Sequence, residues 1–293
     1  MTALQSLLEA AAEPLRHGFM VEAMLVAAFV GAVCAVLSCF VVLKGWALVG
    51  DAVSHAVLPG IILAYVAGLP MSLGAVASGM ACVLSAGAIE ARCRVKSDAV
   101  LGIAFTGFLA LGMVLLVATP SDIHFMHVLF GNLLGIEPAD MIQTLAVGSV
   151  TLAAVLVLRR DLILFCFDPG QARVTGISPR RLELILLLLV AATIVAALQA
   201  VGVVLVMAML VTPGCIGLLL ADRFGRVMAA AVGSAVLSSV LGTLLSFWLD
   251  GATGPSIVVV QALLFALAFL FAPKNGLLRR VRTSPADPGQ LQA

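Results

Sequence analysis

Long stretches without a charged side chain dominate this sequence and decide what it can fold into. Of its 293 residues, 62% are hydrophobic and 11% are charged, whereas soluble domains average about 45–50% apolar and about 25% charged residues. A membrane-spanning helix needs about 20 consecutive apolar residues, so the chain has room for roughly nine spans and almost no water-soluble domain. The sequence therefore predicts an all-α polytopic membrane protein bordered by lipid. It excludes a nucleotide-binding, proteolytic or DNA-binding module, and no nucleic acid partner is expected.

Apolar windows of about 19 residues, broken at charged and Gly/Pro clusters, predict eight to nine spans. The count stays open because Leu182–Leu220 is almost free of charge and can hold two spans, or one span and a re-entrant turn near Ala200–Gly202. Residues 1–18 are a lead-in without the pattern of a cleaved signal peptide, and residues 276–293 are a tail that we expect to be disordered. The expected spans, within a membrane domain of residues 19–275, are 19–43, 47–68, 71–91, 99–119, 141–158, 182–200, 201–220, 227–249 and 256–271.

Charged residues divide between the two sides of the predicted bundle. Fifteen of the 16 Lys and Arg residues, all except Arg16, fall in alternate connections or in the C-terminal tail. The intervening connections contain no Lys or Arg but carry Asp122, Glu137, Asp140 and Asp250. Basic residues near span ends are retained on the cytoplasmic side. With nine spans we therefore expect an external N-terminus, a cytoplasmic C-terminus and an acidic outer face.

The second predicted span carries the strongest functional signal, because Asp51 and His55 are ionisable and each such group costs a few kcal/mol in a membrane. Four residues apart on a helix, they share one face with Cβ atoms about 5–6 Å apart. A carboxylate and an imidazole provide two ligands for Mn²⁺, Fe²⁺ or Zn²⁺, and a facing subunit can supply two more. Alternatively, the two side chains pair with each other or with a neighbouring helix. Pro59-Gly60 is expected to weaken this helix and expose backbone carbonyls to a cavity.

The outer connection after the fourth predicted span contains Asp122, His124 and His127. The histidines are three residues apart, which is compatible with one helical face. Three interpretations stay open. These side chains can capture or hand over a metal ion, they can contact a partner protein, or they can have no special role, because histidines in a solvated loop need no ligand.

The inner connection around residues 166–177 is predicted to contain a short helix. Asp168 can cap its start, Pro169 suits its first turn and Gly176 can end it. A capped helix on the cytoplasmic surface is more than a simple link requires. It can dock a soluble partner, or it can be a surface helix without consequence.

Together these motifs resemble the permease subunit of bacterial manganese, zinc and iron ABC importers, the metal ABC-3 family. The resemblance covers about residues 19–275 in order. It is carried by the runs Phe40–Gly45, Gly50–Gly60, His127–Gly135, Asp168–Gly176 and Gly254–Val258.

The resemblance implies a bundle like that of type II importers in the bacterial plasma (inner) membrane, paired with a second copy or a related permease. It also implies two cytoplasmic ATPase subunits that bind ATP, an extracytoplasmic metal-binding protein and no permanently bound cofactor, so this chain itself would catalyse no reaction. Asp51 and His55 would line the ion path. The short helix would couple to the ATPase, with Asp168, Pro169, Gly170 and Gly176 shaping it and Ala172 allowing close approach.

The predicted metal follows from the sequence of one motif and its resemblance to one branch of the family. The run Leu129–Gly135 looks most like the manganese and iron branch, and the chain lacks the cytoplasmic His-rich insertion that favours zinc. A zinc importer of the same family is the alternative. A secondary cation transporter that uses Asp51 and His55 without an ATPase is a more distant one, because it gives the short cytoplasmic helix no role.

Overall fold

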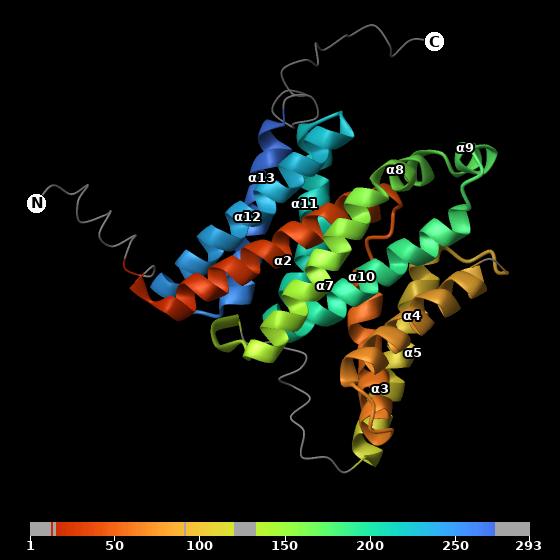
Figure 1. The fold of residues 1–293 in the computed structure, drawn as a ribbon, viewed down its shortest axis with the longest axis horizontal. Helices are drawn as coiled ribbons and strands as arrows, with labels where there is room; N and C mark the ends of the chain where they lie inside the picture. Colours follow the sequence, from red (N-terminus) through yellow and green to blue (C-terminus); the bar gives the residue numbers. More distant parts are fainter. Residues whose placement is uncertain (1–12, 14–15, 91, 120–132, 273–293) are drawn as a thin grey trace, which may run out of the picture.

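The computed structural model describes residue 13 and residues 16–90, 92–119 and 133–272, and the regular structure of these residues is entirely helical (Figure 1). Within them, nine helices are long and apolar enough to cross a membrane. A helix satisfies its own backbone groups, which lipid cannot do. The nine helices are α2 (Gly18–Leu43), α3 (Val49–Val66), α4 (Met71–Glu90), α5 (Ser97–Ala118), α7 (Pro138–Val157), α10 (Pro179–Val201), α11 (Val203–Leu220), α12 (Phe224–Leu249) and α13 (Thr253–Phe271).

Three shorter elements complete the described chain. They are the 3₁₀ turn η2 (Leu133–Gly135) and the helices α8 (Arg159–Phe167) and α9 (Pro169–Val174). Nearly all of the predicted lead-in and the whole of the tail at 276–293 lie outside the described residues, so the expected disorder of the tail stays a prediction.

The almost charge-free stretch Leu182–Leu220 forms two helices, which decides between eight and nine spans. Gly202 ends α10 and begins α11 with a φ of +82°. A residue with a side chain is strained at such an angle, whereas glycine adopts it freely. The break is therefore a change of direction between two complete spans and not a re-entrant turn.

Four helices begin three residues earlier than hydropathy predicts. α7 begins at Pro138, α10 at Pro179, α12 at Phe224 and α13 at Thr253. An apolar window leaves out polar first turns, although the backbone there is already helical. The predicted membrane segments were correct, and their boundaries were short at these ends.

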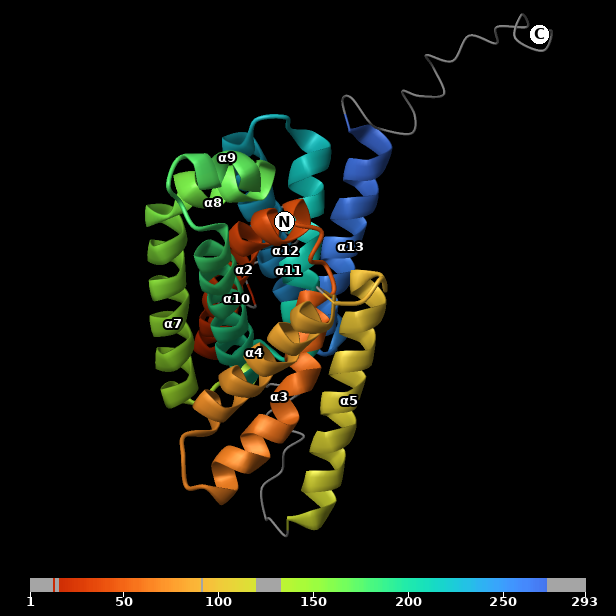
Figure 2. The same ribbon diagram turned by 90° about the vertical axis from the view of Figure 1, so that its right-hand side faces the viewer.

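The bundle is organised around α2 and α3. α2 packs against α11, α12 and α7, whereas α3 packs chiefly against α4 and α5 (Figures 1 and 2). In α2 and α3 the membrane-spanning window is 72% buried, but in α5 and α13 it is 17% buried. The apolar outer faces of α5 and α13 are therefore left for lipid or for another subunit.

Helices α3 and α4 cross with their backbones in contact. A Cβ atom added to Gly60 would overlap the carbonyl of Gly74, and one added to Gly74 would overlap the carbonyl of Gly60. Small residues permit such close approach in membranes. α3 runs through Pro59 to Val66 and Gly60 is buried against α4, while the exposure of backbone carbonyls to a cavity stays a prediction.

Candidate functional site

The two predicted metal ligands lie at the start of α3. Asp51 is in the first turn of the helix and His55 is one turn further, and both side chains are half-buried. Nδ1 of His55 lies 2.9 Å from the backbone carbonyl oxygen of Asp51. A carbonyl can only accept a hydrogen bond, so in the neutral ring Nδ1 carries the proton. Nε2 then keeps its lone pair, which is the arrangement that a metal-binding histidine requires.

A second helix also contacts the imidazole. The ring of Phe105, on α5, lies with its centroid 5.5 Å from that of His55, tilted by 39°. The His55 ring is therefore held between its own helix and α5. Sequence spacing could not identify Phe105 as part of the site, because it is 50 positions away and lies within an ordinary apolar span.

The described residues supply too few ligands for a complete metal site. Among the described residues, no group of three or more His, Cys, Asp or Glu side chains could hold an ion. Transition metals bound by carboxylate and imidazole take four or more ligands. To hold such an ion, Asp51 and His55 would need further ligands from outside the described residues, such as water or another chain.

The outward face of α5 carries an open groove of about 530 Å³ beside this pair. Phe105 lines the groove and also contacts His55. A Cβ atom added to Gly102 or Gly107 would meet nothing within 4 Å, so no described residue covers the groove at these two positions. The groove is lined by Ala99, Gly102, Ile103, Phe105, Thr106, Gly107 and Ala110.

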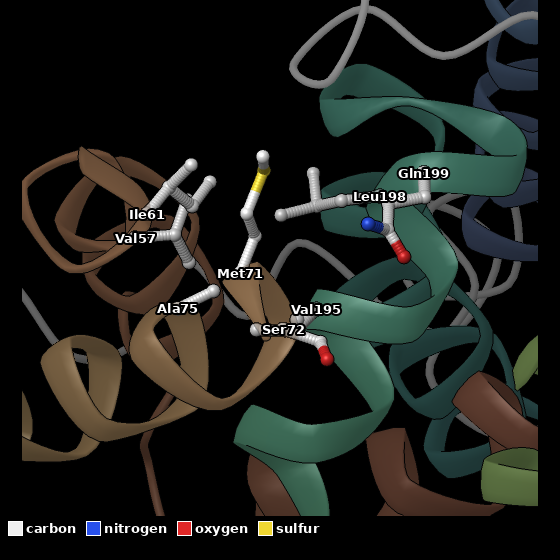
Figure 3. A pocket seen from close by; sticks show the side chains of 8 residues that line it. All are labelled: Val57, Ile61, Met71, Ser72, Ala75, Val195, Leu198 and Gln199. Atoms are coloured by element: carbon white, nitrogen blue, oxygen red, sulfur yellow. The ribbon is translucent and has the colours of Figure 1, made fainter. Parts of the chain in front are cut away.

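A narrow cleft separates α3 and α4 from α10 (Figure 3). Its polar groups are the Ser72 hydroxyl and the Gln199 amide, and the latter accepts a hydrogen bond of 3.1 Å from Gln143. No lining side chain is ionisable, so the cleft is a packing boundary and not an ion site. It is lined by Val57, Ile61, Met71, Ser72, Ala75, Val195, Leu198 and Gln199.

The predicted caps of the short inner helix are confirmed. The Asp168 carboxylate accepts a hydrogen bond of 2.9 Å from the Gln171 N–H, Pro169 occupies the first turn of α9, and Gly176 follows the helix with a φ of +82°. An N-cap, a first-turn proline and a terminal glycine are all local signals. This explains why the sequence alone located the helix.

The predicted helix is longer than the observed one. The region 166–177 holds the end of α8, a corner at Asp168 and then α9, which has six residues. The backbone of Asp168 is extended, with φ −144° and ψ 90°. Because Pro169 has no N–H, it cannot continue the hydrogen bonding of α8, and the chain turns at this point.

This chain is similar to known proteins in both sequence and fold. The family model described as "ABC 3 transport family" matches residues 16–272. The chain belongs to the ABC 3 transport family. As in other members, it is the membrane permease of an ABC transporter, and ATP is hydrolysed by a separate subunit.

Three ABC 3 relatives show how closely the chain follows the family. The manganese transport system membrane protein MntB of Synechocystis is 51% identical over 93% of this chain and 90% of its own length. The chelated iron transport system membrane protein YfeD of Yersinia pestis is 49% identical over 88% of this chain and 87% of its own. The structure of PsaBC from Streptococcus pneumoniae in complex with Fab contains a chain with a TM-score of 0.83 and 32% identity, covering 94% of this chain and 99% of that one.

One residue of this ABC 3 permease does not occupy the predicted position. Ala172 was expected to face the ATPase, but its side chain is fully buried within the chain. α9 lies against α8 and α10, so its small residue faces inward. Phe167 and Val174 are instead 64% and 87% exposed. Exposed apolar side chains at the ends of a surface helix are a better contact for a soluble partner.

The outer-connection residues Asp122, His124 and His127 lie outside the described residues. Their three interpretations therefore stay predictions.

Proposed function

We propose that this chain is one of two permease subunits in an ATP-driven importer of Mn²⁺ that also accepts Fe²⁺, and that Asp51 and His55 are ligands on the ion path. The observation that supports this most is the half-buried pair on α3, with Nε2 of His55 free. A carboxylate offsets part of the ion's charge, and an imidazole binds it without adding charge. Such a pair is costly in a membrane unless it has a function.

The relatives and the ligand chemistry support the same group of metals. MntB and YfeD are named for manganese and chelated iron. Carboxylate and imidazole ligands suit Mn²⁺ and Fe²⁺, whereas a copper(I) site would need thiolate or thioether ligands. Zinc accepts the same ligands, so a zinc importer of this family is the alternative that uptake competition must exclude.

A second permease, either another copy of this chain or a related one, is the proposed occupant of the α5 groove. Phe105 lines the groove and contacts His55, and the described residues offer the pair no third ligand. Gly102 and Gly107 leave room for the close backbone approach by which helices associate in lipid. A partner on this face would bring its own ligands close to Asp51 and His55.

The soluble partners would bind at opposite ends of the bundle. α8 and α9 lie at the same end as the connection between α11 and α12, opposite the α3–α4 turn (Figure 2). Phe167 and Val174 would contact the ATPase there. At the other end, Glu137 and Asp250 contribute to an acidic face that would receive the metal-binding protein.

These contacts support alternating access as the mechanism. The binding protein delivers the ion at the outer face, and the ion passes to Asp51 and His55 between the two permeases. Closure of the ATPase dimer then moves the α9 segments and opens the path inward. This chain contributes ligands and force transmission, and the partner contributes ATP.

The proposed orientation in the bacterial inner membrane places the C-terminus in the cytoplasm. Cys93 is exposed in the connection between α4 and α5, on the basic side. An impermeant maleimide should label it only after the cells are permeabilised. Labelling of Cys93 in intact cells would reverse the orientation.

Reconstitution tests the proposal as a whole. Proteoliposomes containing this permease, its second permease and the ATPase, with the binding protein outside and ATP inside, should accumulate radioactive Mn²⁺. Excess Fe²⁺ should compete more strongly than Zn²⁺. Uptake driven by a proton gradient without ATP would instead support a secondary transporter, and stronger competition by Zn²⁺ would support the zinc alternative.

A further inference from the structure

Lys44 connects two parts of the molecule that the proposed function leaves separate. It ends α2 and lies in the short connection that leads into α3. Its Nζ lies 3.7 Å from the centroid of the Phe165 ring, on α8, and 3.4 Å from the Phe165 backbone carbonyl oxygen, to which it donates a hydrogen bond. The hydrogen bond is longer than usual for an N–H donor, whereas the ammonium lies well within the distance of about 6 Å at which cation–π attraction acts.

The sequence explains why this carbonyl is available. In a continuous helix, the carbonyl of Phe165 would accept from the N–H of residue 169. Residue 169 is proline and has no N–H. Lys44 supplies the missing donor and places a positive charge at the C-terminal end of α8, where the helix dipole favours one.

The surroundings of Lys44 are enclosed. Phe165 is buried, and the neighbouring Cys166 is half-buried. Burial raises the pKa of the Cys166 thiol to about 11, and the nearby Lys44 charge acts in the opposite direction. The ammonium group is therefore held among α8 side chains and is not simply extended into solvent.

The connection between Lys44 and the metal ligands is short and hydrogen-bonded. The N–H of Trp46 donates to the Val41 carbonyl at 2.9 Å, and that of Val49 donates to the Trp46 carbonyl at 3.0 Å. Asp51 follows in the first turn of α3. A displacement of the α8–α9 corner would therefore be transmitted through Lys44 and this short hydrogen-bonded connection to α3.

We propose that Lys44 is a positioning residue that couples movement of the α8–α9 corner to the α3 segment bearing Asp51 and His55. This inference rests on the proposed function. Without Lys44, the ATPase would still bind and hydrolyse ATP, but less of its movement would reach the ion site.

The test uses the complete reconstituted complex and measures ATP hydrolysed per Mn²⁺ transported. Lys44→Met keeps the apolar stem and removes the charge and the donor, whereas Lys44→Arg keeps both. Lys96→Met is the matched control, because Lys96 is an exposed lysine of another inner connection. We expect Lys44→Met to raise the ratio about three- to thirtyfold, with complex yield and basal ATP hydrolysis within about twofold of wild type. Lys44→Arg and Lys96→Met should keep the wild-type ratio.

Three outcomes would overturn the inference. The first is an unchanged ratio in Lys44→Met. The second is a lower yield of complex at an unchanged ratio, which would make Lys44 only a structural residue. The third is no rescue by Lys44→Arg. Failure of the proposed function would look different, because the wild-type complex itself would then show no ATP-driven uptake.

Discussion

The segment of α3 that bears Asp51 and His55 and the docking segment around α9 are determined in different ways. At α9 the determinants are local: the Asp168 cap, the proline that follows it, and Gly176 at a positive φ. On α3 the helix sets only the spacing of the two ligands. The orientation of the His55 ring also depends on Phe105, on another helix.

The two segments also differ in how much of each proposed site this chain supplies. The α9 segment is formed within one chain, whereas the proposed site at Asp51 and His55 needs ligands that the described residues do not supply. Variants around α9 should therefore change binding of the ATPase without changing affinity for the ion. Variants on α3, or in the helices that hold it, should change transport even when the ATPase binds normally.

Removal of a ligand should have the largest effect. Asp51→Asn keeps the shape of the side chain but loses its charge, and His55→Ala removes the imidazole, so ATP-driven Mn²⁺ uptake should fall to background for both. Glu22→Gln is the control, because it also changes a carboxylate to an amide, at an exposed position of α2 that the proposed function does not use. Wild-type uptake by Asp51→Asn, in complexes of normal yield, would refute the site.

Disruption of the α3–α4 crossing should have the second-largest effect. It should lower the stability of the folded permease. A methyl group on Gly74 would overlap the Gly60 carbonyl, and neither backbone can move without separating the helices. Overpacking typically costs about 1–3 kcal/mol, and we expect Gly74→Ala at the upper end of that range. Gly87→Ala, in the same helix with nothing within 4 Å, is the control. Equal thermal midpoints for the two variants in detergent would contradict the crossing.

A charge introduced in the docking segment should weaken only the binding of the ATPase. Val174→Asp places a carboxylate in the most exposed apolar position of α9, and loss of a central apolar contact costs about 2 kcal/mol, roughly thirtyfold in affinity. Val95→Asp makes the same change at an exposed valine of another inner connection. Titration of the purified permease with the ATPase should weaken for the first variant and stay unchanged for the second. Similar affinities for both would place the docking surface elsewhere.

The smallest effect is expected from the residue that supports the imidazole. Phe105→Leu removes a ring contact of a kind worth about 0.5–1.5 kcal/mol, so the concentration of Mn²⁺ that gives half-maximal uptake should rise about two- to tenfold. Phe108→Leu, in the same helix, controls for loss of aromatic volume. If Phe108→Leu has the greater effect, the contact between Phe105 and His55 does not orient the ligand.

The sequence predicted most of the fold, the placement of Asp51 and His55 on one helix, and the caps of α9. Apolar length fixes the spans, and local caps fix α9, because both depend on neighbouring residues. The inward position of Ala172 and the contacts of Phe105 and Lys44 arise from packing between distant segments. The proline that frees the Phe165 carbonyl was a readable signal, but only the fold shows that Lys44 is its donor.

Spectroscopy of bound Mn²⁺ tests most directly whether His55 is a ligand on the ion path. Electron spin echo measurements on the purified permease pair detect nitrogen nuclei bonded to the ion. The account predicts nitrogen modulation from imidazole in the wild-type complex, and loss of at least half of its amplitude in His55→Ala, whether the second permease is a copy or a relative. Modulation of unchanged amplitude in His55→Ala would show that the ion is bound elsewhere.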